Sequence, residues 1–525
     1  MNRVLTLNMD KMKITNKKYI ALLCSAVLFV GAGCSSQFLE EEDPSNIAPE
    51  TFFTTPADAE TAVKGAYENF RFHGDGAGIF SANFQLLDAL SGTAETETGQ
   101  NSDLNNLYSY QYTGDNLHLQ QWWQQCYEGI ANANLSIEKI PTIPSIPDAE
   151  AKKWVGQAKY LRAFYYFWVV RLWGDVPLLT APIYTWKDPN VNAPRTSTEE
   201  VYALIVQDLL DAEQAGFEQT DNTGLASVIA VKSLLARVYL TMAGYPLNKG
   251  AQYYQLAATK AKEVIDYSIA NPGKVALFPS YDDLHDPAKK NIGEHIFQIQ
   301  YAAGIANANY QTYFLPNNTN ITASGEVGTT VPTEDFLATY EPNDKRTVEK
   351  GFYFKQYFLD GGTGAPVTLN RFYVYKHFDV VANGKPGAAG TGNSGLNYPL
   401  IRYADVLLMY AEAQNEVGLN PEAYAALKAV RDRAGLTTPD IGTFNQSTFR
   451  TAVWTERWHE LSFEGITWFD MVRLRKVYDV ETKTFVDFAG ATVNDAVLQE
   501  KHYLLPLPAA DFRNNPNLQP NNPGW

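Results

Sequence analysis

Pairs of amphipathic helical segments joined by short turns are the feature that most constrains the fold of this chain. Two pairs stand out: ASVIAVKSLLARVYLTMAG with QYYQLAATKAKEVIDYS, and IRYADVLLMYAEAQNEVG with PEAYAALKAVRDRAG. Alanines occupy positions of close helix packing, and tyrosines or leucines fill the space between them. Because a helix with one apolar face needs a neighbour to cover it, the pattern predicts a mainly α-helical protein of stacked hairpins.

The segment WVGQAKYLRAFYYFWVVRLWGD shows how one such helix is specified. Apolar residues recur every three or four positions from Trp154 to Trp168, and Gly174 and Pro177 end the pattern. Similar reasoning predicts helices at residues 56–70, 120–140, 148–173, 198–215, 226–243, 253–267, 402–417, 421–434 and 448–474.

The hairpins resemble tetratricopeptide repeats, in which each unit stacks on its neighbours. These repeats are irregular, at about 56–270 and 400–475, and a stretch at about 271–399 interrupts them. That stretch is rich in Gly, Asn, Tyr and Phe, with short strand-like pieces such as HIFQIQY and RFYVYKHF. Since loops of this length inside a compact protein usually carry function, we expect this loop-rich insertion to carry the ligand site.

The N-terminus has the order of a signal peptide. Four lysines precede the apolar run Ile20 to Val30, and small residues follow before Cys34. The run is about half of the ~20 residues that span a bilayer. We therefore predict a signal peptide at 1–33, a lipid on Cys34, a flexible tether at 34–55 and one domain at 56–525. Simple secretion, or a cleaved leader with an inert Cys34, is the alternative.

Cysteine content and charge narrow the function further. After loss of the leader and acylation of Cys34, Cys126 stands alone, so no intramolecular disulfide forms. We interpret Cys126 as a buried small hydrophobe rather than a nucleophile. The leader holds five of the 42 basic residues and one of the 58 acidic ones, which leaves a net charge of −20. Such an acidic protein is a poor candidate for nucleic acid or anionic lipid, and its ligand is expected to be neutral or cationic.

Three segments resemble the SusD/RagB family of outer-membrane nutrient-binding lipoproteins. They are AKYLRAFYYFWVVRLWGDVPLL, WTERWHELSFEGITWFDMVRLRK and the C-terminal YLLPLPAADFRNNPNLQPNNPGW. The resemblance covers nearly the whole mature chain in order. It implies a cell-surface location at the outer membrane, and a partner, a SusC-like TonB-dependent transporter to which the protein delivers its ligand.

Charges of alternating sign mark the second of these segments: Glu456, Arg457, Glu460, Glu464, Asp470 and Arg473. Opposite charges three and four residues apart stabilise a helix, and paired they can orient it against the preceding repeats. We interpret this motif as architectural rather than catalytic. The C-terminal strap, about 500–525, is rich in proline, and we expect Leu518 and Trp525 to pack it on the repeats.

No pattern of catalytic residues stands out. The sequence has no GxSxG, GxxxxGK[ST], CxxC or HExxH motif. Glu95 and Glu97 in SGTAETETGQ are the obvious carboxylate pair, and alternate positions in a Gly/Thr-rich loop are typical of solvated acids. The same stretch matches no EF-hand spacing. We therefore expect no enzyme activity, no cofactor and no bound metal.

A binding surface for neutral sugar is the remaining interpretation, because aromatic rings bind apolar sugar faces and polar side chains bind hydroxyls. Aromatic residues in polar, Gly-rich loops are the candidates. They lie in two regions, the loops that follow the first helix and the long insertion before the final repeats, and the family resemblance implies a ligand site in the same two regions. The predicted ligand-binding residues are Phe72, His73, Phe80, Tyr108, Tyr110, Tyr301, Asn309, Tyr310 and Tyr313.

The sequence thus predicts non-catalytic binding of an oligosaccharide or polysaccharide and its delivery to the transporter. A RagB-like peptide-binding lipoprotein is the first alternative, since the negative charge suits cationic peptides. A surface glycoside hydrolase and a purely structural repeat scaffold are the others.

Overall fold

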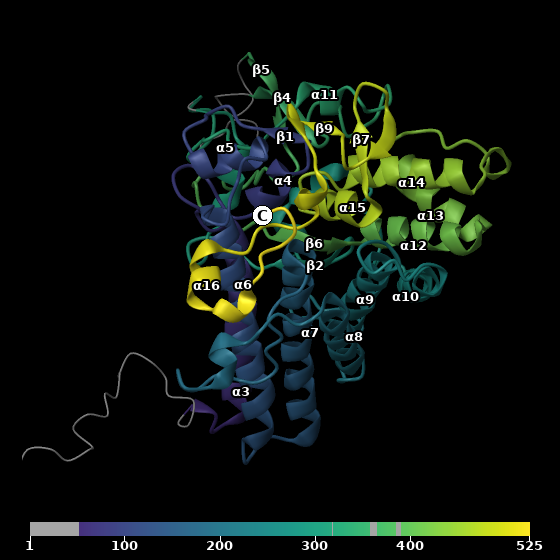
Figure 1. Cartoon of the computed structure of the whole chain (residues 1–525). Helices are drawn as coiled ribbons and strands as arrows, with labels where there is room; N and C mark the ends of the chain where they lie inside the picture. Colours follow the sequence, from purple (N-terminus) through teal and green to yellow (C-terminus); the bar gives the residue numbers. More distant parts are fainter. Residues whose placement is uncertain (1–51, 318, 358–364, 385–389) are drawn as a thin grey trace, which may run out of the picture. The chain divides into compact units, whose positions relative to one another are not determined.

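The structure is a computed structural model that describes residues 52–317, 319–357, 365–384 and 390–525 (Figure 1). The predicted signal peptide, Cys34 and most of the predicted tether lie outside these residues. The chain divides into two units, Met1–Phe52 and Phe53–Trp525, and every element below belongs to the second. Within the described residues, no helix combines the length and the apolar character that spanning a membrane requires.

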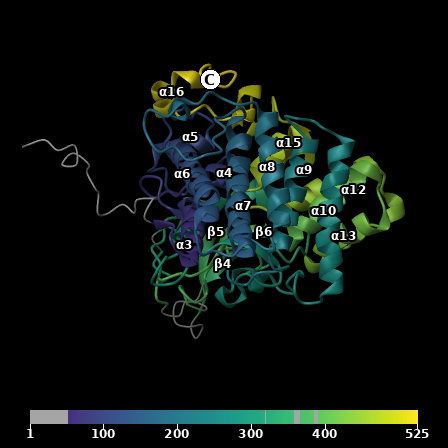
Figure 2. The same cartoon turned by 90° about the horizontal axis from the view of Figure 1, so that it is seen from below.

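Helices dominate this unit, which confirms the mainly α-helical prediction. The longer ones are α3 (Pro56–Glu68), α6 (Leu117–Lys139), α7 (Asp148–Trp173), α8 (Thr198–Glu213), α9 (Val228–Ala243), α10 (Ala251–Ala270), α12 (Tyr403–Gly418), α13 (Pro421–Arg433) and α14 (Gln446–Glu460). Successive helices pack on one another, α6 on α7, α7 on α8, α9 on α10, α10 on α12 and α12 on α13. Figure 2 shows this row of helices from below.

The longest of these helices is α7, which begins and ends where the sequence predicts. Asp148 and Glu150 lie in its first turn, where negative charge complements the helix dipole. Gly174 ends it with a φ of +73°, a conformation that glycine adopts without strain. A β-carbon at Gly129 of α6 would overlap the ring of Tyr165, so the two helices approach closely there. Cys126 of α6 is fully buried and burial raises the pKa of its thiol, which confirms that it is a small core residue.

The single helix predicted at 448–474 is wrong, because the chain turns between α14 and α15 (Thr467–Leu474). Phe463 and Gly465 have left-handed φ values of +60° and +66° in this turn. The carbonyls that the turn exposes accept hydrogen bonds from the insertion. Lys376 Nζ donates to the carbonyls of Glu460 and Ser462 at 2.8 and 3.0 Å, and His377 Nε2 donates to that of Phe463 at 2.7 Å.

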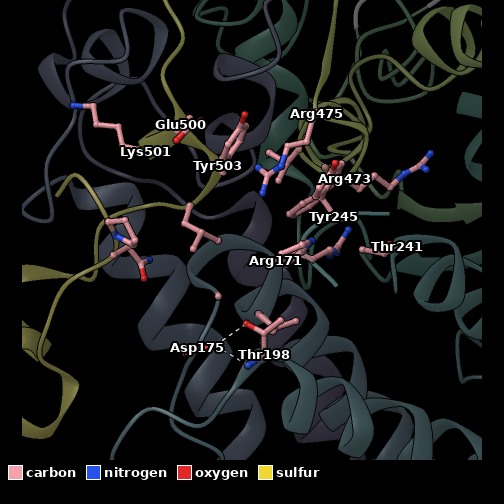
Figure 3. A pocket seen from close by; sticks show the side chains of 18 of the residues that line it. Arg171, Asp175, Thr198, Thr241, Tyr245, Arg473, Arg475, Glu500, Lys501 and Tyr503 are labelled. Carbon is pink, nitrogen blue, oxygen red and sulfur yellow. Dashed lines mark hydrogen bonds between the residues drawn. The ribbon is translucent and has the colours of Figure 1, made fainter. Parts of the chain in front are cut away.

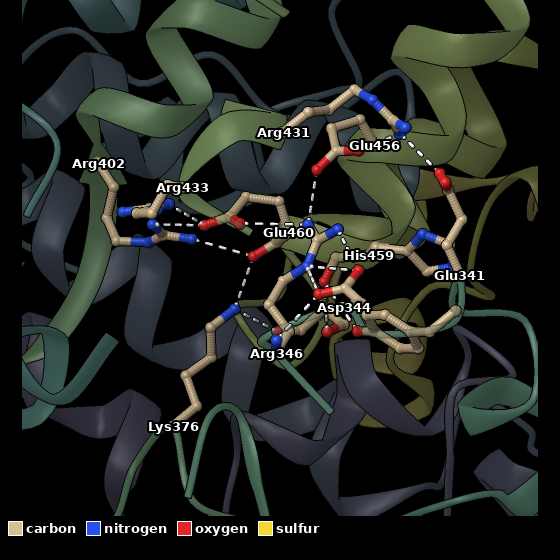
Figure 4. Close-up of polar contacts among 12 residues, drawn as sticks. Glu341, Asp344, Arg346, Lys376, Arg402, Arg431, Arg433, Glu456, His459 and Glu460 are labelled. Carbon is tan, nitrogen blue, oxygen red and sulfur yellow. Dashed lines mark hydrogen bonds and ion pairs between the residues drawn. The ribbon is translucent and has the colours of Figure 1, made fainter. Parts of the chain in front are cut away.

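A buried ion network joins α14 to the rest of the fold (Figure 4). Arg402 Nη1 lies 2.5 Å from Glu294 and 3.1 Å from Glu460, and Arg346 Nη1 lies 2.7 Å from Glu456. A second set binds α12, with 2.7 Å between Arg457 and Asp405 and 2.6 Å between Arg473 and Glu412. The alternating charges are therefore architectural, as predicted, and most of their partners are distant in sequence.

The strands are short and form five antiparallel pairs among the described residues, β1–β3, β2–β6, β4–β5, β7–β8 and β9–β10. Their bounds are β1 (Ala94–Glu95), β2 (His295–Ile299), β3 (Val331–Pro332), β4 (Tyr353–Tyr357), β5 (Val367–Val374), β6 (Tyr398–Arg402), β7 (Lys476–Asp479), β8 (Thr484–Asp487), β9 (Thr492–Val493) and β10 (Ala496–Val497). β2 and β6 lie near the two ends of the insertion and pair with each other, so they close it at its base.

Short helices complete the unit: α4 (Gln85–Ala89), α5 (Ser102–Tyr108), α11 (Glu334–Leu337) and α16 (Ala509–Asn514). The C-terminal segment packs along the end of α7. Leu518 is buried, Trp525 Nε1 donates to the carbonyls of Lys501 and Leu504 at 2.9 Å, and Asn522 Nδ2 donates to that of Trp173 at 3.0 Å. Leu518 is thus buried as expected and Asn522 joins the segment to α7, whereas the Trp525 hydrogen bonds stay within the C-terminal segment.

Candidate functional site

The loop after α3 and the loops of the insertion meet in the folded protein. The hydroxyl of Tyr301 lies against Gly74, where a β-carbon would collide with it. Tyr108 Oη donates to the carbonyl of Thr329 at 2.9 Å, and Gln85 Nε2 donates to Thr330 Oγ1 at 2.6 Å. Strand β1 pairs with β3 beside these contacts. The two regions that the sequence singles out are therefore one continuous part of the molecule.

A cluster of buried aromatic rings packs beneath these loops. His377 and Tyr398 stack with ring centres 5.1 Å apart, and His73 lies 4.4 Å from Tyr398. Tyr310 donates its hydroxyl to the carbonyls of Leu396 and Asn397 at 3.2 Å. Burial lowers the pKa of His73 to about 3 and that of His377 to about 4, so both rings are neutral at physiological pH.

Six of the predicted site residues belong to the packed interior: Phe72, His73, Tyr108, Tyr110, Tyr301 and Tyr310. Phe72 packs edge-on against Trp122 with ring centres 5.1 Å apart, and Tyr110 donates its hydroxyl to the carbonyl of Leu90. The structure thus places these six predicted ligand-binding residues in the interior, where their rings pack against the protein rather than lie open on the loops. Folding the loops back onto α6 and α7 covers large apolar surfaces, and that gain is greatest for aromatic rings.

Phe80 is exposed, at the tip of the loop that follows α3. Its side chain is 43% exposed and that of its neighbour Ile79 is 57% exposed. The loop is a tight turn, closed by a bridge between Gly76 and Ala82. Asn101 Nδ2 donates to the carbonyls of Ala77 and Ile79 at 3.2 and 2.9 Å. The backbone behind the two exposed apolar side chains is thus held by hydrogen bonds.

The insertion contributes the matching exposed side chains. Asn309 is exposed and Tyr313 half-buried, and both lie on the 3₁₀ turn Asn309–Phe314. The Tyr313 ring centre is 6.1 Å from that of the buried Phe84. Burial and the Asp75 carboxylate raise the pKa of Tyr313. Ile305, 90% exposed, tops a small loop closed by a bridge between Ala302 and Ala306.

We call this set of side chains the loop surface: Asp75, Ile79, Phe80, Ile305, Asn309 and Tyr313. Ile79, Ile305 and Asp75 are absent from the sequence prediction, which searched for aromatic residues. Each lies within one or two positions of a glycine, and an aliphatic residue flanked by glycine in a polar loop is the signal that would have found Ile79 and Ile305.

The acidic pair Glu95 and Glu97 is engaged by other side chains, while the Glu95 side chain stays 46% exposed. Arg371 Nη2 forms an ion pair with Glu95, and Tyr373 donates its hydroxyl to Glu97 at 2.5 Å. Both partners come from β5, so the two acids hold this strand against β1 and the loop that follows it. Throughout the described part of the chain, no three His, Cys, Asp or Glu side chains gather in a way that suits a metal ion.

Comparison with known proteins agrees with this architecture. Residues 345–525 match the model of the SusD family, and residues 37–240 match a model described as starch-binding associating with outer membrane. The crystal structure of a SusD superfamily protein from Parabacteroides distasonis is 34% identical in sequence. Its TM-score is 0.83, over 90% of this chain and all of that one. The chain belongs to the SusD family.

Other SusD-like proteins align with most of the chain. The SusD-like protein P2 of Formosa agariphila is 28% identical over 546 residues, which cover 98% of this chain and all of that protein. A laminarin binding SusD-like protein has the same fold, with a TM-score of 0.70, 22% identity, and coverage of 90% of this chain and all of that one. The family assignment made from the three sequence segments is thus confirmed.

Proposed function

We propose that this SusD-family protein binds a soluble oligosaccharide at its loop surface and leaves it chemically unchanged. The observation that carries the proposal is that Phe80 and Tyr313, on two backbone-braced loops, keep part of their rings open to solvent. Asp75 and Asn309 on the same loops offer acceptors and a donor to sugar hydroxyls. The starch-binding description of the matched family and the laminarin binding relative support a glycan as the ligand.

The physical basis is the match between ring faces and sugar faces. A pyranose ring presents apolar C–H groups on its faces and hydroxyls at its edge, so it gains both from stacking and from polar contacts at the side. Braced loops lower the ordering cost of binding, because the backbone behind Ile79 and Phe80 is already held by Asn101. A non-catalytic binder needs no further chemistry at this surface.

Isothermal titration of the protein against malto-oligosaccharides, laminarin oligosaccharides and xylo-oligosaccharides tests the proposal. We expect one class to bind and its affinity to fall about 3- to 10-fold in Phe80→Ala and again in Tyr313→Ala, from the value of one aromatic contact. Trp186→Ala is the matched control, because Trp186 is 81% exposed and lies outside the loop surface. Binding of cationic peptides but of no glycan would overturn the proposal, as would equal losses in all three variants.

The same samples separate binding from hydrolysis. We expect the bound oligosaccharide to be recovered intact after long incubation, because Glu95 and Glu97 are already engaged by Arg371 and Tyr373. Release of shorter sugars that stops in the Glu95→Gln, Glu97→Gln double variant would instead establish a glycoside hydrolase.

We also propose that the protein is anchored by a lipid on Cys34 at the outside of the outer membrane and passes its ligand to a SusC-like TonB-dependent transporter. The description of the matched family as associating with the outer membrane supports this location. Cys34→Ala should leave binding in solution intact, abolish retention in the membrane fraction and reduce uptake. We expect the transporter to co-purify with the anchored protein. Ligand uptake by the Cys34→Ala strain equal to that of the strain with the unsubstituted protein would contradict the role proposed for the lipid.

A further inference from the structure

A pocket of about 560 Å³ lies at the C-terminal end of α7 and shares no residue with the loop surface (Figure 3). Its walls come from the ends of α7 and α9, the start of α8, the helix α15 and the C-terminal segments around residues 500–504 and 522–524. The volume is within the range of about 300–1,000 Å³ that is typical of small-molecule sites. Apolar walls include Val170, Pro246, Phe469 and Leu504.

One side chain of this pocket, Arg171, is a cation held between two aromatic rings. The centre of its guanidinium lies 3.7 Å from the ring centre of Phe167 and 3.6 Å from that of Phe469. Its Nε donates to the carbonyl of Phe167 at 2.7 Å. Burial lowers the pKa of Arg171 to about 9, so the group remains charged at neutral pH.

The second, Arg475, has an unused donor. Its guanidinium stacks 3.2 Å from the ring centre of Tyr503 and 5.2 Å from that of Tyr245, and its Nη1 is buried without a hydrogen-bond partner. The residue has a left-handed φ of +54°, which is uncommon outside glycine. Figure 3 shows Arg171, Arg475, Tyr245 and Tyr503 converging at one end of the pocket, while Lys501 extends away from it.

The charge balance of the lining is opposite to that of the chain. Five basic residues line the pocket with two acidic ones, whereas the whole chain has 42 basic and 58 acidic residues. Arg473 is neutralised by Glu412 and Asp470, and Asp175 caps α8 by accepting from Thr198 N and Oγ1 at 2.7 and 2.8 Å.

The remaining arginines of the pocket make no direct ion pair, although nearby carboxylates act on them at longer range. Among the described residues, Arg171, Arg195 and Arg475 make no ion pair; Arg195 donates only to the neutral oxygens of Asp175, Pro520 and Asn522, the first being its backbone carbonyl. A buried cation with open donors is costly unless an anion meets it.

We infer that this pocket binds a small carboxylate carried on a ring, with Arg475 and Arg171 receiving the carboxylate and Tyr245, Tyr503 and Leu504 covering the ring. Planar guanidinium groups suit carboxylates because two parallel N–H donors meet the two oxygens. The ring is that of a uronic acid or of an aromatic acid, which share the carboxylate and a flat or apolar face. This site is independent of glycan binding at the loop surface.

Titration calorimetry of the full chain with glucuronic acid and with phenylacetic acid tests the inference, with glucose and phenylacetamide as the neutral counterparts. We expect at least one acid to bind, its neutral counterpart to bind at least about tenfold more weakly, and Arg475→Gln to weaken the acid about tenfold or more. Arg513→Gln is the matched control, because Arg513 is 66% exposed and lies outside the pocket, and it should leave the affinity unchanged.

The outcomes separate cleanly. Binding of glucuronic acid alone identifies a uronate site and binding of phenylacetic acid alone an aromatic acid site, and either supports the inference. Phe80→Ala should leave acid binding unchanged, and Tyr245→Ala, at a 43% exposed position, should weaken it without unfolding the protein. No saturable binding of either acid, equal binding of acid and neutral compound, or equal affinities in Arg475→Gln and Arg513→Gln would overturn it.

Discussion

Arg402→Met removes an arginine that contacts three carboxylates of the buried ion network. Its guanidinium lies 2.5 Å from Glu294, 3.1 Å from Glu460 and 2.7 Å from Glu464, and all four side chains are at most 2% exposed. Removing one partner of a buried ion pair costs about 3–5 kcal/mol, because the remaining charge is left without compensation. Glu294 and Glu460 keep Arg433, and Glu464 keeps Lys376, so we expect a loss of about 3 kcal/mol.

Lys428→Met is the control for this prediction. Lys428 pairs with Asp432 four residues later on α13, and the two side chains are 44% and 53% exposed. Such an exposed pair contributes less than about 0.5 kcal/mol and is screened by salt.

Urea unfolding followed by circular dichroism measures both variants, with the free energy of unfolding taken from the midpoint at an unchanged slope. Adding 1 M NaCl should narrow the gap between the unsubstituted protein and Lys428→Met, and leave that for Arg402→Met nearly as large. A loss in Arg402→Met within about 1 kcal/mol of that in Lys428→Met would refute the reasoning, because the network would then behave as a surface feature.

Three further predictions concern packing, pH and the buried thiol of Cys126. Gly129→Ala should destabilise the protein by about 1–3 kcal/mol, because the new methyl overlaps the Tyr165 ring. Gly65→Ala, with open space around it on α3, should instead stabilise the protein by up to about 1 kcal/mol. Thermal melts measure both variants, and a shift of the melting temperature of the same sign in both would contradict this. Burial lowers the pKa of His73, His118 and His295 to about 3, against about 6.5 in the unfolded chain. Between these pH values only the unfolded chain takes up the protons, so the free energy of unfolding falls as the pH drops. Asp88, with its pKa raised to about 7, acts in the opposite sense between about pH 4 and 7, but one such group is outweighed by three; the urea midpoint should be lower at pH 5.0 than at pH 7.5, and equal midpoints would count against it. Cys126 should react with Ellman's reagent only after denaturation, since it is fully buried, and prompt reaction in the native protein would show an opening that the packing of α6 does not allow.

Local periodicity predicted most helices within a few residues, and α7 at both ends, because a long apolar stripe closed by Gly174 leaves little choice of register or boundary. The same reasoning failed between α14 and α15. The spacing of charged and apolar residues continues through Phe463, yet the chain turns there. Bonds from Lys376 and His377, about 85 residues earlier in the chain, stabilise the turn, and no local pattern reports them.

The candidate site divides in the same way. The two loop regions are recognisable from glycine and aromatic content, but the sequence does not tell which rings end in the interior. That depends on which packing partners the fold supplies. The ring of His73 packs against Tyr398 and that of Phe72 against Trp122, while Phe80 at a loop tip stays 43% exposed. Burial of a loop aromatic is a tertiary property, since either outcome satisfies the local backbone.

By itself, the sequence determined that this chain folds as stacked helical hairpins, that it belongs to the SusD family and that its charges of alternating sign are structural in kind, because these follow from periodicity and from motifs read along the chain. Only the tertiary structure decided which aromatic rings face solvent and that a pocket lined by arginines without a direct ion pair exists. Arg171 and Arg475 are far apart in the sequence and come together because α7 packs near α15 and the C-terminal segment. Contacts of this kind depend on how helices stack, and the pattern within each helix does not contain that information.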